Sequence, residues 1–162
     1  MTDSSETMVA MLIEIEALRR LKARYFRYLD TKQWDKWGNL FTEDCTLHNP
    51  GKRDEPLQGR DQIVRTVSRN MVEIVSVHHG HMPEIEILDD RSARGVWAMY
   101  DRLIGPPPGG IGRALLEGYG HYIEEYRKEA DGQWRIARLE LRRLHLDTSQ
   151  FDRNVDPAAY PD

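Results

Sequence analysis

Apolar residues in the first part of the chain recur every three or four positions, which is typical of an amphipathic helix. The spacing predicts a helix from Met8 to Thr31, followed by two shorter helices over Trp34–Phe41 and Arg60–Ile74. The apolar face predicted for the first helix consists of Met8, Met11, Leu12, Ile15, Leu18, Leu21, Tyr25 and Leu29.

The second half of the chain changes to long segments rich in β-branched and aromatic residues, which favour strands. Turn residues at Asp89–Asp90 and at 130–132 each separate two of these segments, and the proline-rich stretch Gly105–Gly110 predicts a longer loop between the two pairs. Helices that precede long antiparallel strands indicate an α+β fold, in which the helices cover one face of a curved sheet. The predicted strands are Cys45–Asn49, Ser76–Leu88, Ser92–Ile104, Ala114–Arg127 and Gln133–Leu146.

The chain of 162 residues has the size of one domain, which we place at residues 8–146 between a polar N-terminus (1–7) and a polar tail (147–162). Its net charge of −4 without a basic cluster argues against a nucleic-acid partner. The only cysteine, Cys45, is expected in the core. Because neither a signal peptide nor a membrane-spanning apolar run is apparent, we expect a cytoplasmic protein.

Asp30 is the first candidate for chemistry, because it ends the predicted first helix. The carbonyl end of a helix is itself negative, so a carboxylate there is unfavourable unless another group compensates it. The alternative is a cap for the helix that begins at Trp34.

Three histidines on one predicted strand form the second candidate group. Alternation places His78 with Gly80 and Met82 on one face, and His79 with His81 on the other. His78 next to a glycine suits a general base, and a structural histidine is the alternative. His79 and His81 have the spacing of a metal-ligand pair, but no third ligand is apparent at a matching distance, so we predict no metal site.

Three further polar residues complete the candidate set. Asp101 continues the apolar face of Trp97 and Met99, where a cavity would give the carboxylate a role. Tyr25 lies on the apolar face of the first helix, with core packing as the alternative. Strict alternation places Arg143 opposite Trp134 and Ile136, where a surface ion pair is the alternative. Together these groups suit proton abstraction next to a carbonyl, followed by loss of a leaving group.

Several segments resemble the SnoaL-like branch of the nuclear-transport-factor-2-like superfamily. The opening Lys22-Ala-Arg-Tyr25-Phe-Arg-Tyr-Leu-Asp30 is similar to the start of that branch. The segments His78–Ile87 and Gly95–Ile104, and the pattern from Tyr126 through Trp134 to Arg143, look most like the bile acid 7α-dehydratases. Scytalone dehydratase and hexachlorocyclohexane dehydrochlorinase are similar more distantly. The resemblance covers roughly residues 12–150.

The resemblance implies a cone-shaped fold and a lyase that uses no cofactor. His78 would remove the proton, Asp30 would orient its ring, and Tyr25 would donate to the developing enolate oxygen. Asp101 would lie near the departing hydroxyl, and Arg143 would orient Asp101 or an anionic substrate group. The family also implies a homo-oligomer, either a trimer or a dimer.

The implied substrate is a small apolar molecule, such as the bulky hydroxy-ketone of a steroid, that loses water. An isomerase, cyclase or dehydrohalogenase with the same pair of residues is the first alternative, and a non-catalytic binding module is the second. The residues expected to bind the substrate are Trp37, Asn49, Met82, Trp97, Met99, His121 and Tyr122.

Overall fold

The computed structural model describes residues 4–50, 54–106 and 113–151. The part of the proline-rich loop beyond Pro106 and the end of the tail beyond Phe151 lie outside these ranges. The elements in chain order are α1 (Ser4–Asp30), α2 (Trp34–Gly38), β1 (Phe41–His48), β2 (Leu57–Gln58), α3 (Arg60–Met71), β3 (Val75–Ile87), β4 (Ser92–Gly105), β5 (Arg113–Lys128) and β6 (Trp134–Phe151).

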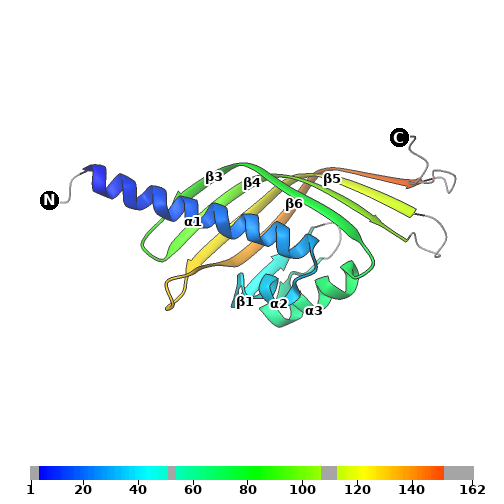
Figure 1. The fold of residues 1–162 in the computed structure, drawn as a ribbon, viewed down its shortest axis with the longest axis horizontal. Helices are drawn as coiled ribbons and strands as arrows, with labels where there is room; N and C mark the ends of the chain where they lie inside the picture. The colour runs from blue at the N-terminus through cyan, green and yellow to red at the C-terminus, as the bar shows by residue number, and fades with distance from the viewer. Residues whose placement is uncertain (1–3, 51–53, 107–112, 152–162) are drawn as a thin grey trace, which may run out of the picture.

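One six-stranded sheet in the order β2-β1-β6-β5-β4-β3 forms the second layer of the molecule. β1 pairs with β6 in parallel, and all other neighbours are antiparallel. α1 runs along one face of this sheet, with α2 and α3 beside its C-terminal end (Figure 1). The predicted α+β class is therefore confirmed.

Several elements differ from the prediction in extent. α1 begins at Ser4 rather than at Met8, α2 ends at Gly38 rather than at Phe41, and α3 ends at Met71 rather than at Ile74. β1 begins at Phe41 rather than at Cys45, because α2 ends at Gly38 and the chain then turns directly into the sheet. The predicted loop before α3 contains the short strand β2, which pairs with β1. β6 continues past Leu146 to Phe151 because β5 supplies a partner along its whole length.

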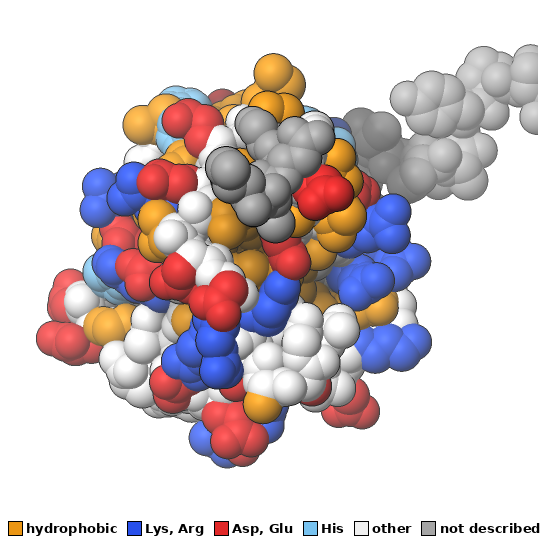
Figure 2. All heavy atoms as spheres, turned by 90° about the vertical axis from the view of Figure 1, so that its left-hand side faces the viewer, with side chains coloured by type: hydrophobic (Ala, Val, Ile, Leu, Met, Phe, Trp, Pro, Cys, Tyr) orange, Lys and Arg blue, Asp and Glu red, His pale blue; other side chains and the backbone are white. Residues whose placement is uncertain are grey.

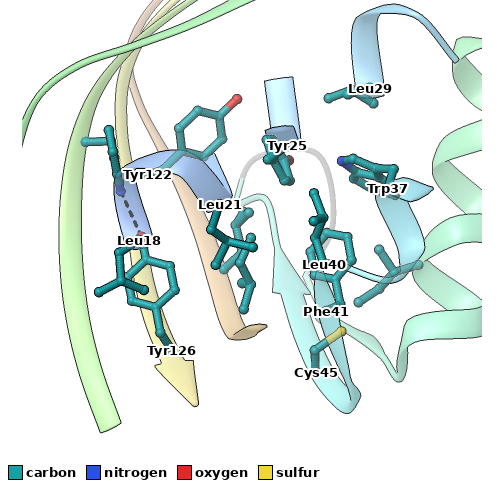
Figure 3. Packing of buried hydrophobic residues seen from close by; sticks show 14 of the residues in the cluster. Leu18, Leu21, Tyr25, Leu29, Trp37, Leu40, Phe41, Cys45, Tyr122 and Tyr126 are labelled. Atoms are coloured by element: carbon teal, nitrogen blue, oxygen red, sulfur yellow. Dashed lines mark hydrogen bonds between the residues drawn. The ribbon is translucent and has the colours of Figure 1, made fainter. Parts of the chain in front are cut away.

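The packed part of α1 is its second half. Leu18, Leu21, Tyr25 and Leu29 are buried and contact Trp37, Phe41 and Tyr122 in the core (Figure 3). Glu14 fixes the helix to the sheet, because its carboxylate accepts from Lys128 Nζ at 2.7 Å and from Trp134 Nε1 at 2.6 Å. These contacts set the position of Asp30 at the far end of the helix.

The first turns of α1 do not pack as the apolar pattern predicted. Met8, Met11 and Leu12 are exposed, together with their neighbours Val9 and Ile13. Apolar side chains are exposed on the end of the molecule where α1 begins (Figure 2). A helix of 27 residues is about 40 Å long, and its first turns extend away from the packed core. None of the helices in the described ranges has the length and apolar character needed to cross a membrane.

Irregular pairing in β6 overturns one prediction. The register shifts between Glu125 and Tyr126, so that Tyr126 pairs with Ile136 while Tyr122 pairs with Leu141 and Gly120 with Arg143. The extra residue in β6 inverts the alternation. Arg143 therefore shares the inner face with Trp134 and Ile136, rather than lying opposite them.

Candidate active site

Asp30 and His78 form a hydrogen-bonded pair between the end of α1 and the strand β3. The Nδ1 atom of His78 donates to Oδ1 of Asp30 at 2.6 Å, and the backbone N–H of His78 donates to Oδ2 at 2.9 Å. The alternative in which Asp30 caps α2 does not hold, since the N-cap residue is Gln33, which makes no side-chain capping bond, and the Asp30 carboxylate bonds to β3.

Two residues that sequence reasoning missed support this carboxylate. Ser76 lies two residues before His78 on β3 and donates its hydroxyl to Oδ1 of Asp30 at 2.9 Å. Lys32 Nζ in turn donates to the Ser76 hydroxyl at 2.9 Å. These bonds and the nearby positive charge offset the unfavourable position at the helix end. The signal for Ser76 was its i−2 spacing from His78, which gives both residues the same face of the strand.

The second ring nitrogen of His78, Nε2, has no hydrogen-bond partner within the described ranges. His78 also belongs to the wall of a surface hollow of about 370 Å³ between α1 and β3, beside Phe26 and Trp97. Gly80 does not leave room at this wall as the sequence suggested. The Phe26 ring occupies the space beside Gly80, and a Cβ at this position would lie 2.7 Å from the ring.

Asp101 and Arg143 form a second pair on the inner face of the sheet. The guanidinium donates from Nη1 to Oδ1 at 2.9 Å and from Nη2 to Oδ2 at 2.6 Å, and Asp101 is 2% exposed. Burial disfavours the charge on Arg143, but the hydrogen bonds to Asp101 and the charge of Asp101 together outweigh it, so the pKa of Arg143 is raised. Gly118 provides the space, because a Cβ there would lie 1.6 Å from Arg143 Nη1.

Tyr25 lies in the core between α2 and β5. Tyr25 and Asp30 are five positions apart on α1, so their side chains leave the helix axis about 140° apart. Burial and the charges of Glu124, Asp30 and Asp101 raise the pKa of Tyr25 well above its usual value, which keeps the phenol protonated. Its hydroxyl has no hydrogen-bond partner among the described residues.

Trp37 Nε1 near the Tyr25 ring is likewise buried without a partner in the described part of the chain. Of the other residues expected around a substrate, Trp97, Met99 and Tyr122 are buried on the inner face. Asn49 directly follows β1 and is partly buried.

Met82 and His121 do not lie where the sequence predicted. A register shift between His81 and Glu84 inverts the alternation of β3, and Met82 at φ 42° is 87% exposed. His121 pairs with Ala98 and Arg142 on the outer face of the sheet, opposite Tyr122. Neither residue can line an interior pocket.

His79 and His81 lie on the outer face as predicted, with ring centroids 5.5 Å apart. The described residues contain no group of three or more histidine, cysteine or acidic side chains able to hold a metal ion.

A buried ion pair was the largest omission of the sequence reasoning. Lys22 on α1 is bonded to Glu124 on β5, and both side chains are inaccessible to solvent. The other oxygen of Glu124 accepts the Tyr126 hydroxyl at 2.5 Å, and Tyr126 accepts Trp97 Nε1 at 2.8 Å. The available signals were Lys22 next to the apolar face of the helix, and Glu124 between Tyr122 and Tyr126 at strand alternation.

Comparison with known proteins places this architecture in a family. Residues 10–140 match the model of the SnoaL-like domain. A scytalone dehydratase candidate from Novosphingobium aromaticivorans is 22% identical and superposes with a TM-score of 0.74, covering 96% of this chain and 99% of its own. A type 2 hexachlorocyclohexane dehydrochlorinase is 14% identical, with a TM-score of 0.75 and coverages of 92% and 97%.

A Mycobacterium tuberculosis protein of unknown function is also similar, at 27% identity and a TM-score of 0.69, with 84% of this chain and 75% of that one covered. At identities this low, the solved structures support the fold rather than a specific activity. The family match covers most of the chain, including Asp30, His78 and Asp101. This protein therefore belongs to the SnoaL-like family and has its NTF2-like fold.

Proposed function

We propose that this protein is a cofactor-independent lyase that eliminates water from a bulky apolar hydroxy-ketone, such as a steroid. The observation that supports the proposal most is the contact between Asp30 and His78, which leaves Nε2 of the imidazole without a partner in the described chain. The similarity of the fold to a dehydratase candidate and to a dehydrochlorinase is consistent with an elimination.

His78 acts as the base in this proposal. Its Nε2 accepts a proton from the carbon α or vinylogous to the ketone, next to the carbon that carries the hydroxyl group. The C–H electron pair moves toward the ketone oxygen and forms an enolate or, in a conjugated enone, a dienolate. Asp30 holds the neutral ring in the tautomer with hydrogen on Nδ1 and stabilises the imidazolium that forms. Ser76 and Lys32 keep the carboxylate oriented.

Tyr25 donates its hydroxyl hydrogen bond to the enolate oxygen. Its raised pKa keeps it protonated at neutral pH, and the absence of a partner among the described residues leaves the hydrogen free for the substrate. The donor is not consumed, because it stays protonated through the reaction.

The second half of the reaction expels the hydroxyl group. The enolate electrons form the new carbon–carbon double bond, the C–O bond breaks, and the imidazolium of His78 returns its proton to give water. Asp101 is a poor proton donor because both of its oxygens accept from Arg143. We assign Asp101 to holding Arg143, whose remaining N–H groups can bind the departing oxygen.

The apolar character of the substrate is inferred from the inner-face side chains Trp97, Met99 and Tyr122, with Trp37 beside them. The proposal favours an enzyme over a binding module because such a module has no need for an oriented Asp–His pair. Dehydrohalogenation begins with the same proton abstraction, so product analysis must distinguish it from dehydration.

The test is to incubate the protein with 7-hydroxy-3-keto-4-ene steroids and their coenzyme A thioesters and follow the conjugated diene by absorbance. We expect the signal to rise with the unchanged protein and to vanish in His78→Ala. His145→Ala, an exposed histidine on the outer face, should retain it. A flat signal across the panel would reject the steroid substrate, and full activity of His78→Ala would reject the mechanism.

The homo-oligomer implied by the family is part of the proposal. A row of rings crosses the outer face of the sheet, with Tyr100 and Tyr119 at 5.2 Å between His79 and His145. Light scattering on the purified protein should give the mass of a dimer or trimer, and a monomeric mass at micromolar concentration would contradict it.

A further inference from the structure

The Lys22–Glu124 ion pair lies directly behind the proposed oxyanion donor. The Lys22 ammonium is 4.1 Å from the centroid of the Tyr25 ring, 3.7 Å from that of Tyr122 and 4.8 Å from that of Phe26. Its side chain is completely buried, as is that of Glu124. The ammonium therefore faces aromatic rings in an environment without water.

Such a pair is not explained by stability alone. Removing two charges from water costs several kcal/mol per ion, and apolar residues of similar volume are often equally stable or more so. Burial lowers the pKa of Lys22, while Glu124 acts in the opposite direction and favours the charged form. The bond to Glu124 therefore holds the Lys22 amine at a position where the fold alone does not need an ion pair.

The two nearest rings belong to phenols whose hydroxyls have no partner in the described ranges. The ring centroids of Tyr25 and Tyr122 are 6.1 Å apart. Burial is the main cause that raises the pKa of both phenols, and the charge of Asp101 adds to it. Figure 3 shows the Tyr122 hydroxyl pointing away from Tyr126, so it does not join the network that ends at Glu124. Both hydroxyls are therefore available to a ligand near Asp101.

A cation on the face of an aromatic ring attracts its π electrons. In a phenol this withdraws charge from the oxygen, which makes the O–H group a stronger hydrogen-bond donor and stabilises negative charge on its partner. The effect is largest where water is excluded, because the local dielectric is low.

We propose that Lys22, held by Glu124, is a positioning residue that polarises Tyr25 and Tyr122 into a two-phenol site for an oxyanion. The ligand class is an enolate or phenolate oxygen attached to an apolar ring. This inference rests on the proposed role of Tyr25 and extends it to Tyr122 and to the ion pair behind both rings.

The test uses 4-nitrophenolate as the probe and 4-nitroanisole as its neutral counterpart, with binding followed by quenching of tryptophan fluorescence. The variant Lys22→Met/Glu124→Gln removes both charges and leaves an amide oxygen to accept Tyr126. Lys128→Met/Glu14→Gln is the matched control, since it removes another ion pair between the same elements α1 and β5. Circular dichroism and the thermal midpoint establish that each variant folds.

We expect the unchanged protein to prefer the phenolate, and Lys22→Met/Glu124→Gln to lose about 5- to 30-fold in phenolate affinity while anisole affinity is kept. Tyr25→Phe should lose a similar factor, with less than additive loss when the changes are combined. The control pair should bind both probes normally.

Three results would overturn the inference. The unchanged protein could show no preference for the phenolate. The Lys22→Met/Glu124→Gln variant could lose affinity for both probes equally, or it could keep its full affinity for the phenolate. Because binding is measured without turnover, these results are independent of the steroid assay. A protein that binds phenolate as expected but eliminates no water would reject the proposed function and keep the inference.

Discussion

His78 is bonded to Asp30 through two of its nitrogens, with the ring Nδ1 at 2.6 Å from one carboxylate oxygen and the backbone N–H at 2.9 Å from the other. The first bond fixes the ring tautomer and the second fixes the strand against the helix end. The orientation of the proposed base and the docking of β3 on α1 are thus set by one carboxylate.

Replacing Asp30 with Asn should separate these two roles. The amide oxygen can still accept the backbone N–H of His78. The amide NH₂ group would then donate to Nδ1 and favour the tautomer with hydrogen on Nε2, so Nε2 would no longer accept a proton. We expect kcat to fall by about 10²- to 10⁴-fold with a nearly unchanged thermal midpoint. Asp35→Asn on the exposed face of α2 is the control. Activity near normal in Asp30→Asn would refute the role of the pair.

Gly118→Ala should disrupt the Asp101–Arg143 pair, because the added methyl carbon would lie 1.6 Å from Nη1 of Arg143 and 2.3 Å from Oδ1 of Asp101. Breaking a buried ion pair costs about 3 to 5 kcal/mol of unfolding free energy, which urea denaturation measures. Gly95→Ala should lose less unfolding free energy, because its Cβ would lie 3.1 Å or more from the nearest side-chain atoms, those of Tyr126 and Trp97. Equal losses in both variants would show that the pair has room to move.

Tyr122→Phe should change how stability responds to alkaline pH. Burial and the charge of Tyr25 raise the pKa of Tyr122 well above 10.0, so the folded protein keeps a proton that the unfolded chain loses near pH 10. The stability from this group is complete below that pH and is lost as the pH rises toward the folded pKa. Above pH ~10 the unfolding free energy of the variant should fall by up to about 1.4 kcal/mol less per pH unit than that of the unchanged protein. The exposed Tyr119→Phe is the control, and parallel curves for both variants would contradict the prediction.

Met82 and Met99 should respond oppositely to truncation. Met82 has a left-handed backbone and an exposed side chain, so Met82→Gly should keep or raise the unfolding free energy by up to about 1 kcal/mol. Met99 is buried on the inner face, and Met99→Ala should cost about 2 to 5 kcal/mol. Chemical denaturation of both variants checks this. A destabilised Met82→Gly would show that the side chain packs in the interior.

The sequence was sufficient for the elements and the layers, because helical and strand periodicities are local properties. It failed where pairing between strands decides the outcome. The extra residue in β6 and the shift in β3 invert the alternation for Arg143 and Met82. The shift in β3 contains Pro83, a residue that can mark a bulge, but the sequence does not show that the alternation changes there. The extra residue in β6 lies between Ile136 and Arg138, where neither glycine nor proline marks it. The start of α1 is apolar yet exposed, since periodicity does not reveal how far the sheet extends.

The Asp30, His78 and Asp101 positions of the site were accessible because each residue interrupts a local pattern. Lys22 and Glu124 were not, because either residue alone reads as a solvated charge at the border of an apolar face. Only the approach of α1 to β5 brings them together, across 102 positions of the chain. Gly118 is similar, since its role appears only when Arg143 is placed beside it.

β3 is an edge strand of the sheet, and the backbone N–H of His78 would be an unpaired hydrogen-bond donor if it did not bond to the carboxylate of Asp30. Unpaired backbone N–H and C=O groups on edge strands can pair with a strand of another molecule, which leads to aggregation. The opposite edge strand, β2, has only two residues and therefore offers few unpaired backbone groups. Asp30 therefore also protects the solubility of the folded chain, and its loss through Asp30→Ala would remove that protection together with the orientation of the imidazole.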